Sequence, residues 1–344
     1  HPQSMGMLGM HGTYWANMVM HYSDLVVAIG ARFDDRVTGK VSEFCPHAKV
    51  IHIDIDPTSI RKNVNVDIPI VGDCKMVLRE LIQILRATVN GDQRELRKPW
   101  WDQIREWQQA NPLAYQQEAD GPIKPQHVIQ RLYELTKDRD PIVSTDVGQH
   151  QMWAAQYFKL AKPNRWLTSG GLGTMGFGFP AAMGAQAAFP GRLVLCIAGD
   201  GSIQMNMQEM ATAVVHKLPV KIIILNNRFH GMVRQWQDLF YEGRYASSDL
   251  ETTPDFVKLA EAYGAVGLRA SKPSEIDAVL KEAIAVNKPV IVDVPTYRYE
   301  NVYPMIPAGG CNHEMILEDP PALRNKQSGA GQVAPKDSDT ILTA

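Results

Sequence analysis

Two apolar segments that both end in polar side chains constrain the fold of this chain more than any other feature. Residues 192–198 precede Gly199-Asp200-Gly201, and residues 219–225 precede Asn226-Asn227. Such apolar runs are typical of strands buried on both faces of a parallel sheet. Residues 203–216 between them have the length of a crossover helix. A right-handed βαβ unit would bring both strand ends to one edge of the sheet, where such folds bind ligands.

Asp200 and Asn227, 27 residues apart, are therefore expected to face each other as oxygen ligands. This pair suits Mg²⁺, which takes a few protein oxygens and completes its octahedron with water and phosphate. A GDG followed at this distance by NN is the pattern of proteins that bind thiamine diphosphate. The alternative is two ordinary turns at strand ends, but two matched ends with the correct crossover argue against it.

Composition excludes several classes of protein. The 344 residues are enough for about two domains, and 45% hydrophobic with 21% charged residues is typical of a soluble globular protein. A net charge of −2 without a long basic run argues against binding to nucleic acid or to an anionic membrane. No apolar stretch approaches the roughly 20 residues of a membrane span.

The four scattered cysteines contain no CxxC pair, which favours a reducing compartment, and we expect a cytoplasmic protein. The first residues, His1-Pro2-Gln3-Ser4, are unlike a translation start, and we expect no signal or transit peptide. We expect the chain to be a piece of a longer protein, cut within a domain.

Residues 1–90 are predicted to form an incomplete α/β domain. Strands are expected at 24–30, 49–56 and 68–73, with a helix over 75–88. Three strands with few helices do not close a domain, so its first half is expected to be absent. Residues 91–123 are predicted to be a polar linker whose tryptophans pack onto a domain.

Residues 124–318 are predicted to form a complete doubly wound domain, and residues 319–344 a loose tail. The expected class is α/β with two doubly wound parallel-sheet domains, the first incomplete. Apart from the unit around Asp200, helices are expected at 125–137, 150–159, 175–188, 254–263 and 274–286, with strands at 141–147, 165–169, 266–269 and 289–295.

Residues 171–176 match the dinucleotide fingerprint GxGxxG letter for letter. We reject that interpretation because Asp200, which would be the ribose-binding acid, already belongs to the GDG motif. The loop also contains more glycine than one pyrophosphate turn needs. Close approach of the backbone to a flat ring explains it better.

Five segments resemble one family closely: residues 1–12, 30–40, 146–156, 169–178 and 231–237. They are similar to the catalytic subunit of acetohydroxyacid synthase (acetolactate synthase) of the bacterial biosynthetic kind. The resemblance extends from His1 to about Glu314. That family has three α/β domains, and this chain resembles the second half of the FAD-binding middle domain together with the whole diphosphate-binding domain.

The resemblance implies roles for residues around the thiamine diphosphate. Asp200, Asn227 and the main-chain carbonyl of Phe229 would bind Mg²⁺. The main chain at Gly173 and Met175 would contact the aminopyrimidine. Met175 would also brace the bent cofactor, and Met232 would line the same cavity. The diphosphate would be held by Gln149, His150, Gly201 and Ser202.

FAD, largely structural in this family, would lie along residues 11–32 and 54–73. Gly30 would permit a close turn, and Arg32 suits a phosphate. Asp54 and Asp73 suit ribose or ring edges, although from sequence alone both could equally be strand-end caps. His11 completes the expected set.

Two further residues are expected to contact the second substrate. Arg36 would bind its carboxylate bidentately; the alternative is a surface ion pair with Asp34 or Asp35. Trp236 would form a wall of the pocket, and the alternative is ordinary core packing.

The reaction implied is decarboxylation of pyruvate and ligation of the two-carbon unit to a second 2-ketoacid, pyruvate or 2-ketobutyrate. The family works as a homodimer, in which the partner's N-terminal domain supplies a catalytic glutamate, with a small regulatory subunit. No glutamate of this chain fits that role, so the isolated chain is expected to be inactive. The alternatives are an FAD-free acetolactate synthase, a pyruvate oxidase, or a non-catalytic cofactor-binding fragment.

Overall fold

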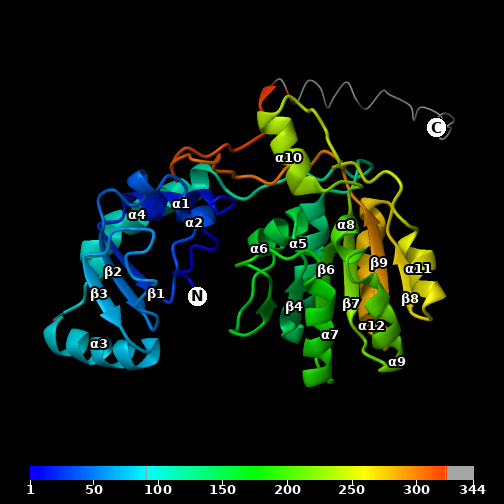
Figure 1. Cartoon of the computed structure of the whole chain (residues 1–344), viewed down its shortest axis with the longest axis horizontal. Coiled ribbons are helices and arrows are strands. Elements are labelled where there is room, and N and C mark those ends of the chain that lie inside the picture. The colour runs from blue at the N-terminus through cyan, green and yellow to red at the C-terminus, as the bar shows by residue number, and fades with distance from the viewer. Residues whose placement is uncertain (90, 322, 324–344) are drawn as a thin grey trace. The chain divides into compact units, whose positions relative to one another are not determined.

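A computed structural model describes residues 1–89, 91–321 and 323. The chain divides into two compact units (Figure 1). The first contains His1–Ala114 and Tyr303–Leu317, and the second contains Tyr115–Val302 and the segment from Glu318 onward. Each unit contains its own parallel sheet, which confirms the predicted α/β class.

The first unit has a three-stranded sheet in the order β1-β2-β3. Its strands are β1 (Leu25–Ile29), β2 (Lys49–Asp54) and β3 (Ile68–Val71), and all pair in parallel. One face packs on a small core that includes Val26 and Phe33, whereas Leu25, Val27 and Ile29 on the other face are 41–50% exposed. The helices are α1 (Tyr14–Tyr22), α2 (Asp35–Thr38), α3 (Cys74–Thr88) and α4 (Arg94–Ala110), with the 3₁₀ turn η1 (Val41–Glu43).

Helix α4 lies where the sequence predicted a linker. Its polarity and Pro99 argued against a helix, yet the chain is helical over 17 residues. One side of α4 is apolar: Ile104 is 2% exposed, and the Trp107 ring stacks on Tyr22 of α1 at 5.7 Å. The helix therefore forms by packing on α1 rather than by intrinsic propensity.

The second unit contains a six-stranded parallel sheet in the order β5-β4-β6-β7-β9-β8. Its strands are β4 (Ile142–Thr145), β5 (Trp166–Leu167), β6 (Val194–Gly199), β7 (Lys221–Asn226), β8 (Val266–Arg269) and β9 (Val290–Pro295). Its helices are α5 (Pro125–Thr136), α6 (Gln149–Tyr157), α7 (Gly178–Ala188), α8 (Asp200–Ile203), α9 (Met210–Val215), α10 (Gly231–Phe240), α11 (Phe256–Ala262) and α12 (Ile276–Ala285), with 3₁₀ turns η2 (Lys137–Arg139), η3 (Met207–Glu209) and η4 (Pro273–Glu275).

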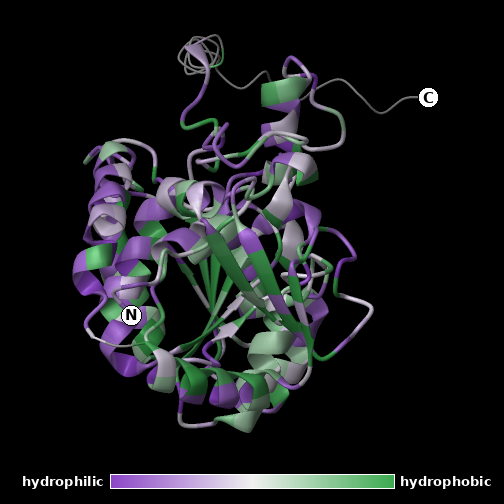
Figure 2. Ribbon diagram, turned by 90° about the vertical axis from the view of Figure 1, so that its left-hand side faces the viewer, coloured by the Kyte–Doolittle hydropathy of each residue, from purple (hydrophilic) through white to green (hydrophobic). Residues whose placement is uncertain are grey.

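Alternate residues of β6 enter two separate cores, one on each face of this sheet. Leu195 and Ile197 pack with α5, α6 and α12, whereas Cys196 and Ala198 pack with α7, α9 and α11. Figure 2 shows the strands as predominantly hydrophobic and the helices as mixtures of hydrophilic and hydrophobic residues. Helices on both faces explain why β6 and β7 are buried at every position.

Two segments differ from the sequence-based prediction. The crossover predicted as one helix over 203–216 is broken into α8, η3 and α9. Residues 303–317, predicted in the second domain, belong to the first unit because backbone bonds from Ile306 to Met10 and from Lys40 to Gly310 attach them there.

The predicted loose tail mostly lies outside the described residues, which end at 321 and 323. Among the helices that the structure does describe, none combines the length and the apolar character needed to cross a bilayer.

Candidate functional site

Asp200 lies at the carboxyl end of β6, beside the end of β7, and is 1% exposed. Backbone amides, including those of Gly201 and Arg228, donate to its carboxylate, yet Oδ2 has no hydrogen-bond partner among the described residues. Burial, with a smaller contribution from the negative charge of Asp293, raises the pKa of Asp200 to about 7. A buried carboxylate with a free oxygen is a site that a cation would stabilise.

Asn227 follows β7 and is 7% exposed. Its Nδ2 donates to Gln149 Oε1 at 3.1 Å, and its Oδ1 accepts from the backbone amide of Phe229 at 3.1 Å. Arg228 between them has a left-handed φ of 55°, which turns the backbone of Phe229 toward the Asn227 side chain. Both strand ends thus present oxygen atoms at one edge of the sheet.

Asp200 is the single carboxylate among the metal ligands expected from the sequence. Across the part of the chain that the structure describes, no three acidic, histidine or cysteine side chains converge as a metal site. A set of one carboxylate, one amide oxygen and one main-chain carbonyl fits Mg²⁺, which retains phosphate and water ligands, better than Zn²⁺.

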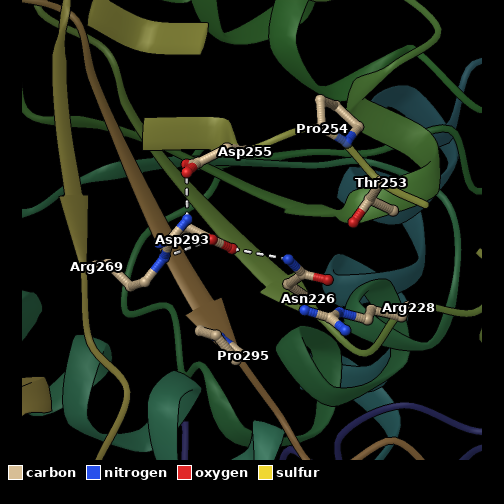
Figure 3. Close-up of a pocket in the computed structure, with 8 residues that line it drawn as sticks. All are labelled: Asn226, Arg228, Thr253, Pro254, Asp255, Arg269, Asp293 and Pro295. Atoms are coloured by element: carbon tan, nitrogen blue, oxygen red, sulfur yellow. Dashed lines mark hydrogen bonds and ion pairs between the residues drawn. The ribbon is translucent and has the colours of Figure 1, made fainter. Parts of the chain in front are cut away.

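The two asparagines of the NN pair have different surroundings. Asn226 Nδ2 donates to Asp293 Oδ1 on β9 at 3.0 Å, and Arg269 of β8 bonds both Asp293 and Asp255. These side chains line a cavity of about 290 Å³ at the carboxyl ends of β7, β8 and β9 (Figure 3). Asn226 therefore ties the end of β7 to β9, a role that no pattern in the sequence indicated.

The first turn of α6 contributes Gln149 and His150. Gln149 Nε2 donates to Gln235 Oε1 and to the carbonyl of Glu300, so its position is fixed from two sides. Burial lowers the pKa of His150 to about 4, although the carboxylate of Asp146 opposes the shift. His150 is thus a neutral imidazole near pH 7, and its Nε2 has no hydrogen-bond partner among the described residues.

Gly201 and Ser202 lie in the first turn of α8, next to Asp200. A Cβ on Gly201 would lie 2.9 Å from the His230 ring, so a side chain would not fit there. The Ser202 hydroxyl accepts from the backbone amide of Gly199 at 3.0 Å. These two predicted diphosphate ligands are buried with Asp200, on the same short turn.

The glycine-rich loop before α7 holds Gly173 and Met175. Gly173 has a φ of 73° and Gly176 a φ of 93°, conformations that favour glycine. Met175 is half-buried, whereas Leu172 is 91% exposed. Asp146, for which the sequence indicated no role of its own, contacts this loop through its carboxylate.

Helix α10 carries Met232 and Trp236 one turn apart. Met232 packs against the core that α5, α6 and α12 share, and the ring of the half-buried Trp236 lies 5.4 Å from that of Phe240 between centroids. Arg234 fixes the helix: it is fully buried and bonds Asp238, Asn301 and the carbonyl of Glu300. No sequence signal separated this buried arginine from an exposed one.

Three of the predicted FAD residues lie at the carboxyl ends of β1, β2 and β3. Gly30 has a φ of 60°, and a Cβ there would meet no described atom within 4 Å. Asp54 accepts from the amide of Asp56 at 2.9 Å, and Asp73 caps α3 by accepting from Met76 at 3.1 Å. The capping alternative is therefore present in the structure, on the edge that a cofactor would also use.

The remaining predicted residues of the first unit lie near its surface or near residues 303–317. Arg32 Nη2 pairs with Asp34 Oδ2 at 2.7 Å near the surface. The Arg36 guanidinium lies 3.4 Å from Met10 Sδ. His11 is buried, with Nδ1 3.2 Å from the carbonyl of Pro304.

Comparison with known proteins identifies two matching families along the chain. Residues 1–81 match the central domain of thiamine pyrophosphate enzymes, and residues 146–294 match their C-terminal TPP-binding domain. The second match contains every residue of the candidate metal site.

Individual relatives agree with this. The chain is 51% identical over 320 residues to the acetolactate synthase isozyme 3 large subunit of Escherichia coli K12, 51% over 319 residues to the large subunit of Haemophilus influenzae, and 49% over 320 residues to large subunit IlvB1 of Mycobacterium tuberculosis. These alignments cover 92% of this chain but 52–55% of each relative, so the chain spans about half the length of the relatives it matches. The resemblance stated from sequence is confirmed, and the chain belongs to the thiamine pyrophosphate enzymes, of which it carries the central and the C-terminal, TPP-binding domains.

Proposed function

We propose that Asp200, Asn227 and the main-chain carbonyl of Phe229 hold Mg²⁺, and that this ion carries the diphosphate of thiamine diphosphate. The observation that carries the proposal is the buried Asp200 carboxylate, whose free Oδ2 lies beside the end of the strand that presents Asn227. A cation is what makes the ionised form of such a group favourable.

The neighbouring side chains fit the rest of the cofactor. His150 Nε2, at the first turn of α6, has no hydrogen-bond partner among the described residues and would donate to a diphosphate. Gln149, Gly201 and Ser202 would complete the diphosphate site. Gly173 and Met175 would contact the aminopyrimidine, and Met232 would line the same cavity. When bound, thiamine diphosphate supplies the electron sink that permits decarboxylation of a 2-ketoacid and transfer of the remaining acyl group.

We further propose that the complete protein is an acetolactate synthase, which decarboxylates pyruvate and ligates the product to pyruvate or 2-ketobutyrate. The identity of about 50% to acetolactate synthase large subunits supports this over a pyruvate oxidase. Arg36 would bind the carboxylate of the second ketoacid, and Trp236 would form one side of the pocket for that substrate.

The first unit would bind FAD at the carboxyl edge of its sheet, with His11, Gly30, Arg32, Asp54 and Asp73 along the cofactor. The complete enzyme would be a cytoplasmic homodimer, because the resemblance places a catalytic glutamate on the partner, and it would bind a small regulatory subunit. We do not propose Glu209 for that role; it lies on the crossover between β6 and β7, where its carboxylate accepts from the Thr212 hydroxyl.

The binding test is calorimetric titration of the purified chain with thiamine diphosphate in the presence of Mg²⁺. We expect Asp200→Asn to weaken binding sharply and the exposed Asp120→Asn, a matched control, to leave it unchanged. Equal affinity in wild type and Asp200→Asn would refute the metal site.

The activity test combines the chain with the N-terminal part of a related acetolactate synthase large subunit. We expect acetolactate from pyruvate only in the mixture, and a flavin absorption spectrum without oxygen consumption. Oxygen uptake would instead indicate an oxidase. Acetolactate formation by the chain alone, at the rate of a complete relative, would contradict the need for a partner.

A further inference from the structure

The carboxylate of Asp146 is fully buried and binds backbone amides of the glycine-rich loop. Asp146 directly follows β4, and its Oδ1 accepts from the amides of Val147 and Gly176, both at 2.8 Å. Its Oδ2 accepts from the amide of Gly178 at 2.9 Å. One side chain thus binds two amides of a loop 30 residues further along the chain.

Asn206, just before η3, binds the same loop from a second segment. It follows α8, and its Nδ2 donates to the carbonyl of Gly176 at 2.7 Å. A Cβ on Gly176 would lie 2.6 Å from that nitrogen, and its φ of 93° also excludes most side chains. Both backbone polar groups of Gly176 are therefore fixed, the amide by Asp146 and the carbonyl by Asn206.

The residues just before Gly176 have fewer neighbours than Gly176 itself. Leu172 is 91% exposed, and nothing lies closer than 3.9 Å to a Cβ placed on Gly173. Met175 immediately precedes the fixed glycine. The Gly173–Met175 main chain is thus held by the anchor at Gly176, by the bond from the Thr174 amide to Ser169 Oγ, and by the bond from the Phe177 amide to the Thr174 carbonyl.

We propose that Asp146 and Asn206 are positioning residues that hold the Gly173–Met175 main chain in place for the aminopyrimidine of thiamine diphosphate. Asn206 lies on the same segment as Asp200, so the anchor also connects the ring end of the cofactor site to its metal end. The proposal rests on the proposed function, because it needs the loop to recognise the ring.

If Asn206 only stabilised the fold, its replacement would have the same effect as the loss of a neighbouring buried hydrogen bond. Ser144 offers the matched control, because its buried hydroxyl donates to the carbonyl of Gly178 at 2.8 Å, two residues beyond Gly176. Removing that bond disturbs the start of α7 and leaves both bonds to Gly176 in place. If the loop contacts matter only for folding, Ser144→Ala and Asn206→Ala behave alike.

The experiment compares two ligands in the same chain, thiamine diphosphate and inorganic pyrophosphate, each with Mg²⁺. We expect Asn206→Ala to weaken thiamine diphosphate by about tenfold, the value of one buried hydrogen bond, and to change pyrophosphate affinity by less than about twofold. Asp146→Asn should act in the same direction and more strongly, and Ser144→Ala should alter neither affinity. Amide hydrogen exchange at Gly173–Gly176 should become faster in Asn206→Ala without ligand.

Equal losses for both ligands in Asn206→Ala, or no loss for either, would overturn the proposal. Unchanged hydrogen exchange at the loop would do so as well, independently of any ligand and even if Asp146→Asn fails to fold. A wild-type chain that binds pyrophosphate but not thiamine diphosphate would instead refute the proposed function, and the ligand-binding part of this inference with it.

Discussion

Replacing Asp200 by asparagine should stabilise the metal-free chain at neutral and alkaline pH while it removes Mg²⁺ binding. The folded-state pKa of Asp200 is about 7, above the ordinary value of 3.8 for an aspartate, because burial disfavours the carboxylate. The stability due to the bound proton is fully present below about pH 4 and is lost as the pH rises to about 7. Asparagine carries no charge at any pH, so the stability of the variant does not fall over this pH range.

The size of the effect follows from the pKa difference. Raising the pKa from 3.8 in the unfolded chain to about 7 in the folded chain costs the ionised protein about 4 kcal/mol of stability. Asp200 Oδ2 lacks a protein partner among the described residues that would offset this cost. Water entry and relaxation reduce the effect, so we expect about 2–4 kcal/mol above pH 7, or roughly 5–15 °C in the melting temperature of the second unit.

The assay is scanning calorimetry of both proteins in EDTA at several pH values from 4 to 8.5. A constant offset would report the altered hydrogen bonds to the amides of Gly201 and Arg228, so the informative quantity is the change of the difference with pH. Asp120→Asn, at an exposed position, should track the wild type throughout. A difference between Asp200→Asn and wild type that stays constant from pH 4 to 8.5 would refute the reasoning.

Three further outcomes follow from the site. His150→Gln should make the free energy of unfolding depend less on pH below about 6.5. The pKa of His150 in the folded chain is about 4, against an ordinary histidine value of 6.5. The wild type therefore loses up to about 3 kcal/mol of stability as the pH falls from about 6.5 to about 4, which calorimetry at several pH values measures. Asp238→Asn should cost about 3 kcal/mol or more in urea unfolding because it leaves the fully buried Arg234 without its counter-charge; a loss below about 1 kcal/mol would show that Asn301 and the carbonyl of Glu300 suffice. Trp236→Leu in the complete enzyme should lower the preference for 2-ketobutyrate over pyruvate by about tenfold, with both products counted in competition, and an unchanged ratio would assign Trp236 to packing alone.

The sequence predicted the second sheet well because β4, β6, β7 and β9 are buried on both faces, and their apolar runs cannot be confused with amphipathic helices. The carboxyl ends of β6 and β7 were placed correctly since they carry Asp200 and Asn227 directly after apolar runs. The break in the crossover was not predicted because residues 203–216 have helical length and composition. The turn at Asn206 is stabilised instead by the hydrogen bond from its side chain to the Gly176 carbonyl. That bond joins residues 30 apart, which no local pattern reports.

Helix α4 and the segment 303–317 could not be predicted for a related reason. Both are polar or irregular in sequence and are fixed by contacts with distant residues, as when Trp107 stacks on Tyr22. The burial of Asp146 was equally hidden, since its partners are three backbone amides rather than a complementary side chain.

The pairing of β6 with β7 gives the spacing between the two motifs a particular meaning. Gly199 is in register with Leu225, so backbone bonds between adjacent strands set the distance from Asp200 to Asn227. The 27-residue interval only has to return the chain to the start of the neighbouring strand. Proteins that share this arrangement can therefore lengthen or shorten the segment around α9, away from Asn206, without moving the two ligands apart, and a search with a fixed interval would overlook them.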